Sequence, residues 1–159
     1  MCRLRNSDEG HSNMLGRCPL SNQRTCRATP PEMEFCKVRG TEITLLIEYG
    51  TRVMQSAMDQ VISRATAKVR RQIAVHGDRC LEDSELPFQS SSDSLLLQAE
   101  PSPEKCITWG VLDSVLDGIR QCAYEQGKYN LMRSIIISGS RGGIGFVSLT
   151  LASPPVSYG

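Results

Sequence analysis

The sequence predicts an α+β fold, a two-layer sandwich of about four strands and two helices in the order β-α-β-α-β-β. Three observations carry this prediction. Residues 41–49 alternate between apolar and polar, residues 52–76 repeat apolar side chains at helical spacing, and residues 108–151 combine a second amphipathic helix with two β-branched runs. Helices between strands favour crossover connections and a helical layer packed on a sheet. A chain of 159 residues accommodates one such domain, predicted at residues 41–152.

The two ends of the chain and one internal stretch are predicted to lack regular structure. Residues 1–40 are mostly polar without periodicity, which predicts a disordered N-terminal tail, and residues 153–159 are a C-terminal tail. Residues 78–93 are polar, contain a serine run and are predicted to form a flexible acidic loop. From Cys80 to Lys105 the chain holds six acids and one base, an excess that is typical of a solvated loop.

A strand and a long helix are predicted in the first half of the domain. Thr41–Tyr49 alternates between apolar and polar residues, which predicts a strand with one buried face, ended by Gly50. Arg52–His76 repeats apolar residues at intervals of three and four, which predicts an amphipathic helix that Gly77 ends. The inward-facing residues are predicted to be Ile43, Leu45, Ile47 and Tyr49 in the strand, and Val53, Met54, Ala57, Met58, Val61, Ile62, Ala65, Val69 and Ile73 in the helix.

Positive side chains gather near the C-terminal end of this helix, at Lys68, Arg70, Arg71 and His76. Positive charge there suits the helix dipole, and a solvated face is the commonest explanation of such a cluster. The alternative is weak binding of nucleic acid or phosphate through Lys68, Arg70 and Arg71. A net charge of +1 and a pI of about 7.6 argue against a dedicated nucleic-acid surface.

A short strand and a second helix are predicted next. Ser94–Ala99 alternates with Leu95 and Leu97 on one face, and Thr108 is suited to cap the helix that follows it. Gly118 interrupts the helix, which a close approach by a neighbouring strand would explain. The apolar stripe of this helix is Val111, Leu112, Val115, Leu116, Ile119, Cys122 and Ala123, and its predicted stop is Gly127.

The last two elements are predicted to form a β-hairpin. Leu131–Ser138 and Ile144–Leu151 are short β-branched runs, and the loop Gly139–Gly143 between them is rich in glycine. One of Gly142 and Gly143 is expected to have a positive φ angle. Within the last strand, the pattern places Ile144 and Phe146 on one face and Val147, Leu149 and Leu151 on the other.

Ser138–Gly145 is similar to the cofactor turn of short-chain dehydrogenases, in which a strand and a Gly-x-x-x-Gly-Ile-Gly loop precede a helix. Tyr124 and Lys128 also have the spacing of the Tyr-x-x-x-Lys pair that this family uses for proton transfer. In that family, however, the turn opens the domain, the pair follows it, and an acidic residue lies about twenty residues further on. Here only fourteen residues follow Gly145, and the pair precedes the turn. A nicotinamide-dependent oxidoreductase fragment is therefore only the alternative function, and no cofactor is predicted.

The seven cysteines are predicted to be free thiols. An odd number cannot all pair within one chain, and no two have the Cys-x-x-Cys spacing of a zinc site. Cys122 belongs to the apolar stripe of the second helix, and a disulfide between two of the others is the alternative if the protein is exported. The full set is Cys2, Cys18, Cys26, Cys36, Cys80, Cys106 and Cys122.

No catalytic, cofactor-binding or metal-binding residue is predicted. The two histidines, His11 and His76, lie in the predicted tail and at a helix end, and no Ser-His-Asp or Cys-His arrangement is identifiable. No run of about eighteen apolar residues exists, so no membrane span is predicted. Met1–Gly40 lacks the apolar core of a signal peptide.

The segment Ile107–Ile119, together with the glycine-containing hairpin after it, resembles a group of small uncharacterised proteins of filamentous ascomycete fungi. Those proteins share a Thr-Trp-Gly-x-Leu-x-x-Val-Leu-x-Gly-Leu segment, which Thr108–Ile119 matches closely, and the likeness in element order extends from Gly40 to Leu151. The resemblance implies secretion for some members and brings no activity, cofactor or catalytic residue. The leading hypothesis is a small non-enzymatic binding or interaction domain of this fungal type, because the predicted fold is complete and holds no catalytic set. The sequence identifies no partner, and a protein is the candidate considered.

Overall fold

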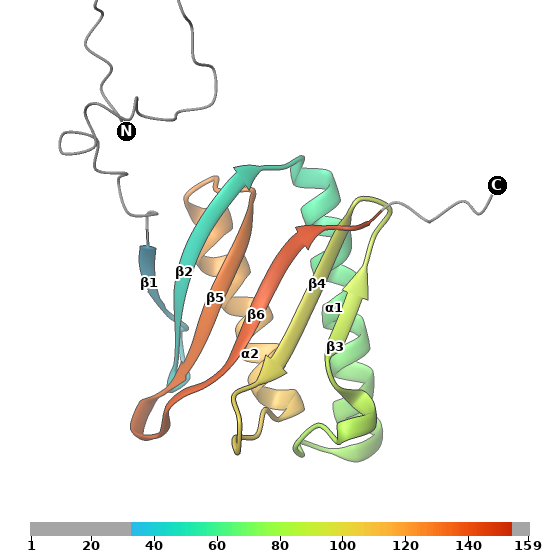
Figure 1. The fold of residues 1–159 in the computed structure, drawn as a ribbon, viewed down its shortest axis with the longest axis vertical. Coiled ribbons are helices and arrows are strands. Elements are labelled where there is room, and N and C mark those ends of the chain that lie inside the picture. The colour runs from blue at the N-terminus through green and yellow to red at the C-terminus, as the bar shows by residue number, and fades with distance from the viewer. Residues whose placement is uncertain (1–32, 154–159) are drawn as a thin grey trace, which may run out of the picture. The chain divides into compact units, whose positions relative to one another are not determined.

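The computed structural model describes residues 33–153, which form one antiparallel six-stranded sheet with two α-helices (Figure 1). A π-helical turn at Arg120–Tyr124 extends the second helix, and a short 3₁₀ turn at Asp83–Glu85 precedes the third strand. The elements are β1 (Met33–Lys37), β2 (Ile43–Arg52), α1 (Gln55–His76), β3 (Phe88–Ser91), β4 (Leu95–Pro101), α2 (Trp109–Ile119), β5 (Asn130–Ser138) and β6 (Gly142–Leu151).

The sheet order is β1-β2-β5-β6-β4-β3, and every neighbouring pair is antiparallel. Both helices lie on the same side of the sheet, behind it in the view of Figure 1. The α+β class and the helical layer on a sheet are confirmed. The predicted number of four strands is wrong, and the observed order is β-β-α-β-β-α-β-β.

The core fills the space between the helices and the sheet. In β2 and β4 alternate residues are buried, as the two-residue period of a strand requires. Phe88 packs edge-to-face on Trp109 with ring centroids 6.0 Å apart, which closes the core beneath β3. The largest fully buried side chains are Trp109, Phe88, Leu45, Ile47, Met58, Ile62, Leu95, Leu97, Leu112, Leu116, Ile119 and Ile136.

The two strands missing from the prediction lie at the edges of the sheet. β1 lies inside the predicted tail of residues 1–40, and β3 lies inside the predicted flexible loop of residues 78–93. Each has only four or five residues, too few to show a clear period in the sequence. Backbone pairing with β2 and with β4 holds them in place. The rest of the predicted N-terminal tail, residues 1–32, lies outside the described residues.

Most predicted element ends agree with the structure. The Thr108 hydroxyl caps α2 by accepting a hydrogen bond from the Val111 backbone N–H at 3.1 Å, and Gly77 follows α1 with φ 75°. Gly118 lies where the side chains of Val38 and Leu45 approach α2, so the predicted close approach is confirmed. The predicted end of β2 at Gly50 is wrong, because the strand continues to Arg52 through an irregularity in its pairing with β5.

The β5–β6 hairpin is confirmed, and its pairing contains a β-bulge. Ile136 pairs with Gly145 and Ile137 with Gly143, so Ile144 is an extra residue on β6. The bulge turns Ile144 into the core, where it is only 1% exposed, and leaves Phe146 on the opposite face. The prediction that these two side chains share a face is therefore wrong.

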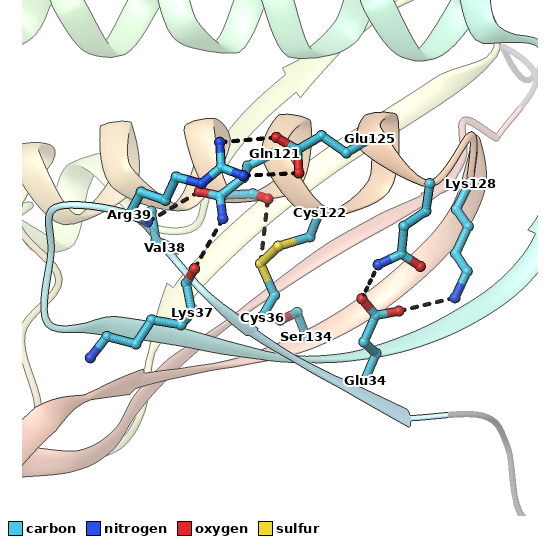
Figure 2. The surroundings of a disulfide bond; sticks show 12 residues. Glu34, Cys36, Lys37, Val38, Arg39, Gln121, Cys122, Glu125, Lys128 and Ser134 are labelled. Atoms are coloured by element: carbon cyan, nitrogen blue, oxygen red, sulfur yellow. Dashed lines mark hydrogen bonds and ion pairs between the residues drawn. A yellow bond between two sulfur atoms is a disulfide. The ribbon is translucent and has the colours of Figure 1, made fainter.

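Two disulfides correct the prediction of free thiols. Cys36 on β1 is bonded to Cys122 in the π-helical turn, and Cys80 is bonded to Cys106 (Figure 2 shows the first bond). The Cys122 side chain lies on the apolar stripe as predicted. At this end of the stripe, however, it faces β1, the edge strand that the sequence did not reveal. The first disulfide therefore ties that edge strand to the end of the helical layer.

Candidate functional site

The glycine turn at Ser138–Gly145 has the structure of a hairpin and not of a phosphate-binding turn. A 3₁₀ turn at Gly139–Arg141 joins the strands, and the residues after Gly143 pair with both β5 and β4. A helix N-terminus, the group that would bind a pyrophosphate, is absent from this place in the described chain. A Cβ atom at Gly145 would lie 2.6 Å from the Glu100 carbonyl oxygen, so close packing of β4 explains that glycine.

Tyr124 and Lys128 lie at the other end of β5 from this turn. The nine residues of β5 separate this pair from the glycine turn, a length of about 30 Å at the usual rise of a strand. Burial raises the pKa of the Tyr124 phenol, and the Asp59 carboxylate adds to the rise. A proton-transfer tyrosine beside a lysine needs a lowered pKa, so the electrostatics here oppose that role.

The Lys128 ammonium is engaged with other residues. Its Nζ atom lies 3.0 Å from the Glu34 carboxylate on β1 and 4.6 Å from the ring centre of Tyr49 (Figure 2 shows the Glu34 contact). Tyr124 packs instead on the ring of Tyr129, with centroids 5.1 Å apart. Through its contact with Glu34, Lys128 helps to hold β1 against the helical layer.

Two of the basic residues of α1, Lys68 and Arg70, do not converge on one point. Lys68 donates a hydrogen bond to the Gln89 carbonyl at 3.1 Å and lies over the Phe88 ring. Arg70 forms an ion pair with Asp113 at 3.3 Å and approaches Asp117 at 3.9 Å. The first two side chains of the proposed Lys68, Arg70 and Arg71 phosphate site therefore contact different elements of the protein itself.

The face of the sheet opposite the helices is covered by no element of the described chain (Figure 1). Cross-strand neighbours Phe35, Leu46, Ile135 and Phe146 form a row of apolar side chains over β1, β2, β5 and β6. Phe35 is 71% exposed and Phe146 is 46% exposed, and the two aliphatic residues between them are half-buried. A continuous apolar row of this kind is typical of an interaction surface.

A second row runs beside the apolar one, and we call it the polar row because its two central residues carry opposite charges. It consists of Met33, Glu48, Arg133 and Ser148 on the same four strands. A hollow of about 320 Å³ is lined by residues of both rows and by Glu100 of β4. We call the surface formed by the two rows the open face.

The open face offers both apolar and charged side chains for binding. The residues that line its hollow include two carboxylates and one guanidinium, but none of them is a histidine or a cysteine. Apolar side chains flanked by opposite charges suit a protein surface of matching pattern.

A second hollow, of about 410 Å³, lies where α1 begins and β6 ends. It is lined mainly by Met54, Ala57, Leu95 and Leu151. The open face is the stronger candidate for a binding surface, because it joins a continuous apolar row to a row with two opposite charges.

Sequence reasoning missed the open face because it needs β1 and the bulge in β6. Phe35 was predicted to lie in a tail, and Phe146 was grouped with the buried Ile144. A signal for β1 exists in the alternation of Met33, Phe35 and Lys37 with the inward-facing Cys36, but five residues are too few to establish a strand.

None of the helices in residues 33–153 is long and apolar enough to cross a bilayer. The same residues contain no group of three or more side chains placed to hold a metal ion. Comparisons with protein-family models, curated proteins and solved structures found no significant match to this chain.

Proposed function

We propose that this chain is a non-enzymatic binding domain that recognises a protein surface through its open face. The observation that carries the proposal is the apolar row formed by Phe35, Leu46, Ile135 and Phe146, which no described element covers. Large aromatic side chains contribute much of the binding energy of protein interfaces, and they rarely lie so exposed on a sheet without a partner.

The disulfides favour an exported protein. Disulfides persist in oxidising compartments and are rare in the reducing cytosol, and this chain holds two of them within residues 33–153. This agrees with the secretion implied for some of the fungal proteins that the Thr108–Ile119 segment resembles. We therefore propose a secreted binding domain of that fungal type.

The first test uses the apolar fluorescent probe bis-ANS at protein concentrations where sedimentation shows a monomer. The wild-type chain is expected to bind the probe and enhance its fluorescence. Replacement of both Phe35 and Phe146 by Ser should remove most of the enhancement, because these two exposed rings form both ends of the apolar row.

A matched control replaces two exposed apolar residues elsewhere on the molecule. Met54 is 73% exposed and Val75 is 69% exposed, and neither lies on the open face. The Met54→Ser and Val75→Ser pair should reduce the enhancement much less, and a small loss is expected because Met54 lines the second hollow. Equal losses in both double variants would remove the open face as the binding surface, and turnover of a substrate that one side-chain change abolishes would overturn the non-enzymatic proposal.

A further inference from the structure

We propose that the partner bound by the open face is a second copy of this chain. The two copies pack face to face about a two-fold axis that runs parallel to the strands, midway between β2 and β5. This inference rests on the proposed function, because it names the occupant of the same surface. A closed two-fold interface requires a surface that is complementary to itself, and both rows of the open face meet this requirement.

The apolar row has the same type of residue at equal distances from the proposed axis. In strand order it consists of Phe35, Leu46, Ile135 and Phe146, which is aromatic, aliphatic, aliphatic and aromatic. The axis between β2 and β5 places Phe35 opposite Phe146 of the second copy. It also places Leu46 opposite Ile135 of the second copy, so the apolar row is buried along its whole length.

The polar row has opposite charges at equal distances from the same axis. Glu48 and Arg133 are direct cross-strand neighbours on β2 and β5. The two-fold rotation therefore places Glu48 of each copy opposite Arg133 of the other copy. Two ion pairs form across the interface, and Met33 lies opposite Ser148 at the ends of the row. This charge complementarity distinguishes a second copy from an unrelated apolar partner.

The remaining charges of the face cause no repulsion in this arrangement. Lys37 lies opposite Gly143, which has no side chain, and Thr44 lies opposite Ile137. Glu100 on β4 is the cross-strand neighbour of Phe146 on β6. β4 lies one strand further from the axis than β6, and no strand lies beyond β1 on the other side of the axis. The Glu100 carboxylate therefore lies outside the four paired strands and stays at the rim, in contact with solvent.

The size of the interface predicts a weak dimer. Four strands about 4.8 Å apart and about eight residues long give a flat footprint on the order of 500 Å² per copy. Specific interfaces bury at least about 1,000 Å² in total, so this face lies near the lower end of that range. Sheets that pack face to face align to within about 30°, an angle that keeps the central strands opposite one another.

The experiment is sedimentation equilibrium of the full chain, from about 1 to about 500 µM, a range suited to weak interfaces. The wild-type chain is expected to be dimeric at the upper end. The variants E48R and R133E each bring like charges together twice in their own homodimer, so each should raise the dissociation constant at least about tenfold.

The decisive measurement is the mixture of these two variants. In a mixed dimer, the two arginines of the E48R chain face the two glutamates of the R133E chain, so both pairs are complementary again. An equimolar mixture should therefore form dimers at concentrations where each variant alone is monomeric. The double variant E48R/R133E should restore the homodimer for the same reason. Circular dichroism checks that each single variant is folded, because the like charges are also neighbours within one sheet.

Three results would overturn this inference. A wild-type chain that stays monomeric at 500 µM while it binds bis-ANS through the open face would leave the proposed function standing with a different protein as partner. A dimer that neither charge variant weakens, or two monomeric variants that do not associate when mixed, would show that the copies do not meet in this register.

Discussion

Gly142 is the residue on which the β5–β6 turn depends most directly. Its φ of +69° lies in the left-handed region, where a side chain costs on the order of 1 kcal/mol, and no atom stands within 4 Å of the place a Cβ would take. The replacement Gly142→Ala should therefore lower the free energy of unfolding by about 1 kcal/mol through backbone strain alone. Equilibrium denaturation with urea measures this difference.

The neighbouring Gly143 is the matched control. A Cβ there would meet only a methyl group of Ile135 at an ordinary distance of 3.7 Å. The replacement Gly143→Ala should change the free energy of unfolding by less than about 0.5 kcal/mol. If both variants lost the same stability, backbone strain at Gly142 would not be the reason for that glycine.

At the scale of elements, the connection between α1 and β3 is held by one well-formed ion pair. Arg79 donates two hydrogen bonds to the Glu85 carboxylate, at 2.8 and 3.2 Å, and a third to the Cys80 carbonyl. The hydrogen bond from Arg79 is the main cause that lowers the pKa of Glu85, and the Glu82 backbone N–H adds to it. The carboxylate therefore stabilises this loop in its ionised form.

A lowered pKa makes the contribution of Glu85 dependent on pH. It is fully present above the ordinary pKa of glutamate, about 4.3, and is lost as the pH falls through the lower pKa of the folded state. Replacement by Gln in the variant E85Q should therefore reduce stability at pH 7 and flatten the fall of the melting temperature between about pH 5 and pH 2. Thermal melting at a series of pH values measures both effects.

Asp83 on the same turn provides the control for this prediction. It makes no ion pair within residues 33–153, so Asp83→Asn should leave the slope of melting temperature against pH close to that of the wild type. An E85Q variant with the wild-type slope would mean that the Arg79 pair does not stabilise the fold.

At the scale of the whole molecule, the two disulfides close loops of very different length. The Cys36–Cys122 bond joins residues 86 apart, and the Cys80–Cys106 bond joins residues 26 apart. Because a longer loop removes more entropy from the unfolded chain, replacement of the first pair by Ala should destabilise the protein by about 1 kcal/mol more than replacement of the second. Each pair alone is expected to contribute about 2–4 kcal/mol.

Urea denaturation of the two double variants, each with the other disulfide intact, measures this difference. The Cys36 variant has a further structural consequence, because β1 loses its covalent link to the helical layer and keeps only non-covalent contacts with it, such as the Glu34–Lys128 ion pair at 3.0 Å. Hydrogen exchange should therefore increase first in Met33–Lys37. Equal stability of the two variants would contradict the dependence on loop length.

The sequence by itself determined the elements whose signals are local. The stripe of α1, the Thr108 cap of α2 and the β-branched runs of β5 and β6 each come from residues close together in the chain. Periodicity, capping and turn chemistry act over a few residues, so these elements could be predicted without knowledge of their neighbours. The same local reasoning rejected the dehydrogenase turn, because the residues after Gly145 read as a strand.

Only the tertiary structure decided the edges of the sheet, the disulfide pairing and the open face. β1 is short and depends on Cys36 meeting Cys122, 86 residues away, and β3 depends on pairing with β4. A bulge at Ile144 decided on which side of the sheet Phe146 lies. The bulge moves the residues on its two sides out of the regular alternation of a strand, and no local pattern revealed it. The candidate site is made of two strand pairs, β1–β2 and β5–β6, that are distant in sequence, so its two rows exist only once the register between β2 and β5 is set.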